Sequence, residues 1–286
     1  MNSGTLPLFT VNSGTSTFWL HQPGGVAGQF ISMIWASAGT AGFGEERIIP
    51  DGSGVLLFNF GDTVSSSAGA VKSETVLKRI LYTGLFTHAA AMHYPPGTRH
   101  EQLGIIFKPG CSSVFTKTHA GAFKNTALAD DISVFPEAER LYDALAACSN
   151  PANRIAQATT LLNRLLALNY AGSSEALIQL IRNFPNESPV QIAARTGYSQ
   201  QHINRILNRD AGANIKTLQR IFRINNAVAE IGRQSSEEHS LTEIALQNGY
   251  FDQAHFIHEF STMTGMLPGT FRKISHLAAG RVIYLP

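Results

Sequence analysis

Two stretches in the C-terminal half of the chain repeat one pattern 52 residues apart. In each, an isoleucine-alanine pair is followed after three residues by a glycine-tyrosine pair, at Ile192-Ala193 with Gly197-Tyr198 and at Ile244-Ala245 with Gly249-Tyr250. Apolar residues at helical spacing come next, and a glycine ends each run. Self-similarity at a fixed period constrains an architecture strongly. It predicts two copies of a helix, a tight turn and a second helix.

The starts and turns of these two units carry clear local signals. Ser188-Pro-Val-Gln191 and Ser240-Leu-Thr-Glu243 predict capping boxes at helix N-termini. Gly197 and Gly249 allow the positive φ that a tight turn after a helix requires. Two helices that cross through such a turn present the second helix to the major groove of DNA.

Residues 175–275 resemble the DNA-binding domain of the AraC/XylS family of transcription regulators. The resemblance rests on two runs, 244–260 with the sequence IALQNGYFDQAHFIHEF and 265–272 with the sequence GMLPGTFR. It implies two helix-turn-helix units joined by one long helix, which matches residues 216–231, with a recognition helix from each unit in successive major grooves. Double-stranded promoter DNA is therefore the expected partner, and RNA polymerase a further one.

The first recognition helix is expected to read bases. Three of its apolar residues face inward, which leaves a polar face that either contacts base edges or is simply solvated. Arginine forks onto guanine, and asparagine or glutamine pairs with adenine. The base-contacting candidates are Gln200, Gln201, Asn204 and Arg205. The phosphate-contacting candidates, which position the protein without reading sequence, are Arg209, Lys216, Arg220 and Arg272.

The second unit departs from the family pattern. Its matching base-contacting candidates are Gln253, Ala254, Ile257 and His258. Many family members have an arginine in place of His258 and a basic residue in place of Ser261. Leu267 also replaces a common serine or threonine. With two cationic groups missing, we expect the first unit to carry most of the direct readout.

The N-terminal half reads as β-rich, with short apolar runs between glycine and proline turns. The expected strands lie within 30–35, 45–49, 55–60, 84–93 and 103–107. Two helices are then predicted over 137–147 and 155–168, followed by a linker at 169–174 and helices almost to the end of the chain. The fold class is α+β, with a β-rich domain over 1–172 and an all-α DNA-binding domain over 173–286.

The N-terminal half also resembles, more loosely, the cupin-like sensor domains of the same family, at residues 47–52 and 103–110. The resemblance implies a domain that binds a small effector or mediates dimerisation. The helices over 137–168 either pair with a second copy of the chain or only cover the sheet. Six aromatic residues either line an effector cavity or form the core of the barrel, and the core is the favoured interpretation. They are Phe18, Trp19, Trp35, Phe58, Phe60 and Phe107.

A cupin-like metalloenzyme fused to a DNA-binding module is the alternative function. His88, His93, His100 and Glu101 are close in sequence but lack the His-x-His pair expected of such a site. Two isolated cysteines, Cys111 and Cys148, have no metal or redox spacing and suit a reducing compartment. We therefore expect no catalytic residues, no metal and no cofactor. A pure oligomerisation domain is a third alternative.

Charge and hydropathy agree with a cytoplasmic DNA-binding protein. The net charge is +2, with 11 Lys/Arg against 12 Asp/Glu in residues 1–175 and 11 against 8 in residues 176–286. A mildly basic C-terminal half suits a phosphate backbone. Neither a signal peptide nor a membrane-spanning stretch is expected.

Overall fold

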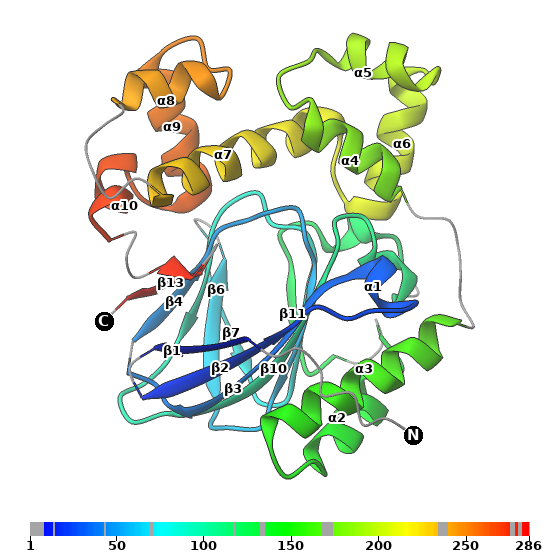
Figure 1. Cartoon of the computed structure of the whole chain (residues 1–286), viewed down its shortest axis with the longest axis vertical. Helices are drawn as coiled ribbons and strands as arrows, with labels where there is room; N and C mark the ends of the chain where they lie inside the picture. Colours follow the sequence, from blue (N-terminus) through cyan, green and yellow to red (C-terminus); the bar gives the residue numbers. More distant parts are fainter. Residues whose placement is uncertain are drawn as a thin grey trace.

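The computed structural model describes residues 9–13, 15–42, 44–68, 71–116, 118–131, 135–167, 174–233, 240–274, 278–279 and 282–285. A β-rich half carries a layer of helices above it, and a second helix pair lies against the opposite side of the β-rich half (Figure 1). Within the described residues, no helix is both long and apolar enough to cross a membrane. The predicted α+β class is therefore observed.

The β-rich half consists of two antiparallel sheets. The seven-stranded sheet has the order β1 (Phe9–Ser13), β2 (Ser16–His21), β3 (Ile31–Thr40), β10 (Arg99–Phe107), β5 (Val55–Asn59), β8 (Ile80–Thr83) and β11 (Ala127–Ala129). The six-stranded sheet has the order β12 (Ala278–Ala279), β13 (Val282–Leu285), β4 (Glu45–Ile48), β9 (Ala90–His93), β6 (Val64–Ala68) and β7 (Val71–Leu77).

Most predicted strands are confirmed, with one correction. Two of the expected runs contain β4 and β5, and two others cover part of the longer strands β3 and β10. The run over 84–93 is wrong in its first part, because only Ala90–His93 forms a strand. The backbone N–H of Gly84 instead donates to the carbonyl of Thr126, and Asn125 donates to Leu85, so these residues join a neighbouring loop.

The helix pair covers the seven-stranded sheet. The short helix α1 (Ala27–Phe30), α2 (Ala138–Ala146) and α3 (Pro151–Ala167) share one apolar core with β3, β5 and β10. The buried face of the pair contributes Leu141, Leu145, Ile155, Ala158, Leu162 and Leu166. The pair therefore covers the sheet with most of its leucines, while Leu161 and Leu165 are partly buried, and pairing with a second copy stays a prediction.

The helical half contains α4 (Glu175–Asn183), α5 (Pro189–Thr196), α6 (Gln200–Ala211), α7 (Ile215–Arg233), α8 (Leu241–Gln247), α9 (Gln253–Thr264) and α10 (Pro268–Ile274). Both predicted capping boxes are present, at Ser188 with Gln191 and at Ser240 with Glu243. Gly197 and Gly249 have φ of 70° and 76°, as the turns require. The long helix α7 separates α5 and α6 from α8 and α9 (Figure 1).

The end of the chain differs from the prediction of helices almost throughout. Strand β13 pairs with β4, so Tyr284 lies opposite Glu46 and Val282 opposite Ile48. A segment that follows the last helix thus completes a sheet of the β-rich half. The predicted linker and domain boundary near 172 lie mostly outside the described residues, and the boundary stays a prediction.

The two halves are joined by packing as well as by β13. Ile49, Leu85 and Ile283 belong to the apolar core of the helical half. The C-terminal end of α6 lies on the 3₁₀ turn Ala120–Phe123, where a methyl group at Gly121 would be 2.8 Å from the carbonyl oxygen of Asn208. The β-rich half therefore contacts the helical half at several separate points.

Candidate functional site

The expected reader in the first unit is α6. The helix begins at Ser199, whose Oγ accepts the backbone N–H of His202 at 3.2 Å. Gln200, Gln201 and Arg205 are exposed, whereas Ile203 and Leu207 are fully buried. The guanidinium of Arg205 lies 3.2 Å from Nδ1 of His202. Because the opposite end of α6 rests on the β-rich half, its N-terminal turns are the part that is open to a partner.

Asn204 has a second role that sequence reasoning missed. Its Oδ1 accepts the backbone N–H of Ile215 at 3.0 Å, and the side chain is half-buried. Ile215 is the first residue of α7, where backbone N–H groups lack helical partners. Asn204 therefore ties the recognition helix to the start of the long helix. Its predicted contact with a base stays a prediction.

The expected reader in the second unit is α9. It begins at Asp252, whose Oδ1 accepts the backbone N–H of His255 at 2.7 Å. Ala254 and His258 are exposed, while Ile257 is half-buried and packs against the helical core. Oε1 of Gln253 accepts a hydrogen bond from Thr242 Oγ1 at 3.1 Å, which links α9 to α8.

The expected phosphate contacts differ in how they are held. Lys216 is exposed at the start of α7, and Arg272 is half-buried in α10. The guanidinium of Arg209 lies 2.5 Å from Oδ1 of Asp210. Arg220 forms an ion pair with Glu259 at 3.2 Å. Lys216 is therefore the cation of this group that is most open to a phosphate.

A buried carboxylate fixes α9 on α7. Glu259 is 4% exposed and lies near Arg220, near the Arg223 guanidinium at 3.8 Å and near His255 at 3.5 Å. The Arg223 guanidinium also lies 5.0 Å from the centre of the Tyr250 ring. Sequence reasoning missed this cluster, because nothing in the pattern of α7 shows that its charged residues face α9.

A cavity of about 1100 Å³ lies between the two sheets. Phe18 and Trp35 line it, as one of the two interpretations proposed. Phe58 and Phe107 instead belong to the core under the helix pair, against which Trp19 and Phe60 are also packed. Successive side chains of a strand point to opposite faces of the sheet, which separates Phe18 from Trp19 and explains the division.

One side of the cavity is polar. The Tyr94 hydroxyl donates to Oε2 of Glu46 at 2.7 Å and lies 3.4 Å from Oε1 of Gln102. Nε2 of His100 is 3.1 Å from the same Gln102 oxygen. Burial raises the pKa of Glu46 to about 7 and lowers that of His100 to about 4. Glu46 and Gln102 line the cavity.

Two segments connect the cavity to the helical half. The loop between β4 and β5 lines it with Ile49, Pro50 and Asp51, and Ile49 is also part of the helical core. Nδ2 of Asn225 in α7 donates to the carbonyl of Pro50 at 2.7 Å. The second segment is β13, whose Val282 and Tyr284 line the cavity.

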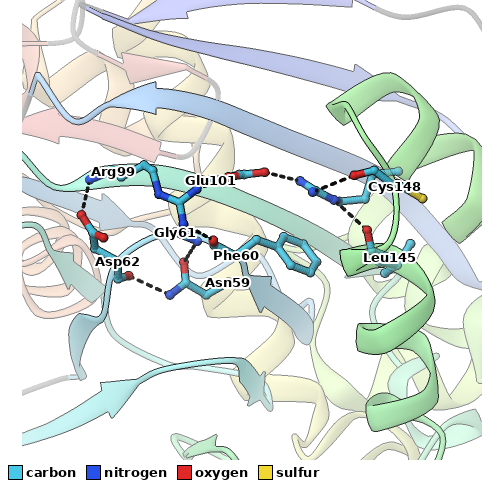
Figure 2. A network of polar contacts seen from close by, with 9 residues as sticks. Asn59, Phe60, Gly61, Asp62, Arg99, Glu101, Leu145 and Cys148 are labelled. Carbon is cyan, nitrogen blue, oxygen red and sulfur yellow. Dashed lines mark hydrogen bonds and ion pairs between the residues drawn. The ribbon is translucent and has the colours of Figure 1, made fainter.

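The residues weighed as metal ligands are held in other contacts. His93 lies 2.9 Å from Ser67 Oγ, and Glu101 forms ion pairs with Arg99 at 2.7 Å and Arg154 at 3.1 Å (Figure 2). The buried Arg154 also donates to the carbonyls of Leu145 and Cys148. The described part of the chain has no cluster of three His, Cys, Asp or Glu residues that suits a metal ion.

Two protein families match separate parts of the chain. A helix-turn-helix domain family matches residues 192–274, which span α5 to α10 apart from the first turn of α5. A domain of unknown function, DUF6597, matches residues 21–129 in the β-rich half. No curated protein sequence has significant similarity to the chain.

Solved structures with a related arrangement are distant in sequence. ToxT from Vibrio cholerae in its P21 form has 8% identity and a TM-score of 0.47, over 84% of this chain and 98% of that one. ToxT bound to an unsaturated fatty acid has 7% identity and a TM-score of 0.46, over 92% and 96%. The C-terminal domain of AraT from Geobacillus stearothermophilus has 19% identity and a TM-score of 0.31, over 34% and 84%.

Proposed function

We propose that the protein is a promoter-binding transcription regulator of the AraC/XylS type, whose activity responds to a small molecule in the cavity. The helix-turn-helix domain family that matches residues 192–274 supports this proposal. The observation that carries the proposal is the pair of matched units, each with a recognition helix whose N-terminal turn is exposed.

The proposed DNA contacts divide between reading and positioning. Gln200, Gln201 and Arg205 face solvent on α6, so these side chains would reach the base edges when α6 lies in a major groove. Ala254 and His258 occupy the matching surface of α9 and offer one methyl group and one imidazole. Lys216 supplies a phosphate contact beside the first unit. The first unit therefore carries most of the proposed readout.

The proposed effector site is the cavity between the sheets. A volume of about 1100 Å³ with mostly apolar walls and a few polar groups is typical of small-molecule sites. Both the 49–54 loop and β13 line this cavity and contact the helical half. A ligand that shifts either segment would therefore change the position of the two helix-turn-helix units. Regulation requires a ligand that makes different contacts in two conformations of the protein, and such a shift would provide them.

The remaining features of the proposal follow from these two sites. Promoter binding places the protein in the cytoplasm, and RNA polymerase and a second copy of the chain are its further proposed partners. The proposed role needs no catalysis. A second copy would have to use a surface other than the buried face of α2 and α3, since that face is packed against the sheet.

DNA-binding anisotropy tests the proposal. We would measure the wild type, Arg205→Ala and Lys216→Ala on DNA from upstream of the protein's own gene and on scrambled DNA, each at two salt concentrations. Arg205→Ala should lose about 1–3 kcal/mol on the upstream DNA and little on the scrambled DNA. Lys216→Ala should weaken both by a similar factor and reduce the salt slope by about 1.

Two other results would contradict the roles proposed for Arg205 and Lys216. If the wild type binds both DNAs equally and Arg205→Ala changes neither affinity, α6 does not read bases. If Lys216→Ala alone changes the preference between the two DNAs, reading and positioning are assigned to the wrong residues.

A further inference from the structure

The cavity lining is mostly apolar and carries polar side chains at several places, one of which we call the polar corner. Its apolar walls include Phe18, Leu20, Met33, Trp35, Leu57 and Met92. The polar corner is formed by Glu46 and Gln102, which share the Tyr94 hydroxyl as a hydrogen-bond partner. A pocket of this kind selects a ligand with one polar end and a long or bulky apolar part.

The polar corner has unused hydrogen-bonding capacity. Gln102 is 1% exposed, and its Nε2 has no hydrogen-bond partner among the described residues. Buried polar groups in folded proteins normally have a partner, because an unmade hydrogen bond costs about 1–3 kcal/mol. Because Nε2 of an amide can only donate, the partner that Gln102 lacks beside the cavity is a hydrogen-bond acceptor, such as a hydroxyl oxygen, that arrives with a ligand.

The charges of the cavity lining disfavour a ligand whose polar end is anionic. Within the described residues, the lining contains the carboxyl groups of Glu46 and Asp51 but no lysine or arginine. His88 is the basic side chain of the lining, and burial lowers its pKa, so it is neutral at pH 7. An anionic ligand would therefore enter a cavity with no cation to pair with it, next to a carboxyl group.

Glu46 is the group of the polar corner that can pair with a cation. The phenols of Tyr94 and Tyr284 have pKa values raised by burial, so they stay protonated, and the pKa of His100 is lowered to about 4. Asp51 is partly committed elsewhere, because its Oδ1 accepts the backbone N–H of Ser53 at 2.9 Å. Glu46 is thus the side chain whose charge changes near neutral pH when a cation arrives.

We propose that the cavity binds an apolar amine that also carries an acceptor oxygen such as a hydroxyl: its ammonium group pairs with the carboxylate of Glu46, the oxygen accepts a hydrogen bond from Nε2 of Gln102, and its apolar part fills the space between the sheets. This inference rests on the proposed function, in which the cavity holds the effector. On binding, the ligand stays protonated and Glu46 becomes fully ionised. The proton that leaves the Glu46 carboxyl goes to the buffer, so charge and atoms balance.

Three probes with one chain length test the ligand class: decylamine, decanol and decanoic acid, each below its aggregation concentration. Calorimetric titration of the full chain would be run on the wild type, Glu46→Gln and Asp51→Asn. We expect the wild type to bind decylamine more tightly than decanol and to bind decanoic acid most weakly. Glu46→Gln should weaken decylamine about tenfold to a hundredfold and leave decanol almost unchanged, and Asp51→Asn should leave both unchanged.

A second readout is the proton released on binding. Because the pKa of Glu46 is about 7, binding of decylamine at pH 7 should release about half a proton per site. Titrations in two buffers of different ionisation enthalpy measure this number. Glu46→Gln should release none, and decanol should release none from either protein.

Three outcomes would overturn the inference: decanoic acid binds more tightly than decylamine, Asp51→Asn rather than Glu46→Gln removes the preference for the amine, or none of the probes binds. The same preparations would be tested on upstream and scrambled DNA. If the wild type and Glu46→Gln still prefer the upstream DNA, only the ligand class has failed. If the wild type shows no preference, the proposed function has failed as well.

Discussion

The side-chain amide of Asn225, in the middle of α7, donates a hydrogen bond to the backbone carbonyl of Pro50, 2.7 Å away in the loop that lines the cavity. The same amide donates to Ile221 within its own helix. One side chain therefore holds the loop of the β-rich half on the helix that joins the two DNA-binding units. The carbonyl of Pro50 lies where the two halves of the protein meet, and a backbone carbonyl that is shielded from water needs a hydrogen-bond donor from the protein.

Asn225→Ala should loosen this connection. We expect the free energy of unfolding to fall by about 1 kcal/mol and amide exchange in residues 50–54 to become faster. The control is Asn226→Ala, on the exposed side of the same helix. Chemical denaturation and hydrogen exchange would compare the two variants, and equal effects would show that the contact with Pro50 has no special importance.

Arg154→Ala should be strongly destabilising. Its guanidinium is 4% exposed, pairs with Glu101, donates to two carbonyls and lies 4.1 Å from the centre of the Phe60 ring. Removal of one partner from a buried ion pair costs about 3–5 kcal/mol. Arg140→Ala, at an exposed pair with Glu137, should cost under about 1 kcal/mol. Urea denaturation would measure the free energy of unfolding of both variants, and similar decreases would contradict a special role for the buried Arg154.

Two glycines with the same backbone geometry should differ in their tolerance of alanine. Gly197 and Gly212 end helices with φ of 70° and 71°. At Gly197 an added methyl group meets nothing within 4 Å, whereas at Gly212 it lies 2.9 Å from the carbonyl oxygen of Ala120. Gly197→Ala should cost about 1–2 kcal/mol from backbone strain alone, and Gly212→Ala should cost clearly more. A thermal melt in which Gly197→Ala is the worse variant would contradict the contact between α6 and the β-rich half.

Stability should depend on pH through two buried groups that act in opposite directions. Glu46 has a folded pKa of about 7 against an ordinary value of 4.5, so its contribution to stability is lost as pH rises through this window. His100 has a folded pKa of about 4 against 6.5, so its contribution is lost as pH falls from 6.5 to 4. Between pH 4.5 and 6.5 the two slopes oppose each other in the wild type.

Variants that remove one group should reveal the slope of the other. Relative to the wild type, Glu46→Gln should lose about 2–3 kcal/mol of stability as pH falls from 6.5 to 4.5, and His100→Asn should lose a similar amount as pH rises over the same range. Urea denaturation at both pH values measures these changes, and the other titrating groups cancel in the comparison. Parallel pH profiles for the three proteins would show that neither group is perturbed in the folded state.

Local signals were enough to predict the helical half. The capping boxes and the turn glycines depend on residues close together in the sequence, and the structure has all of them. The long helix was expected from the family resemblance and is present as α7. Strand β13 was missed because a four-residue strand is defined by its partner, and β4 is far away in the chain. Glu259 and the capping by Asn204 were missed for the same reason, since each depends on which helix lies opposite. Which aromatic residues face the cavity depends on strand register, which the sequence pattern alone does not reveal.

The pairing of β13 with β4 sets an order of events during synthesis. More than 230 residues separate the two strands, so one edge of β4 has no partner until residues 282–285 have been synthesised. An unpaired edge invites pairing with other chains, and charged side chains discourage it. Glu45, Glu46 and Arg47 occupy that edge. The nascent chain thus protects an unfinished sheet with charge until β13 has been synthesised and pairs with β4.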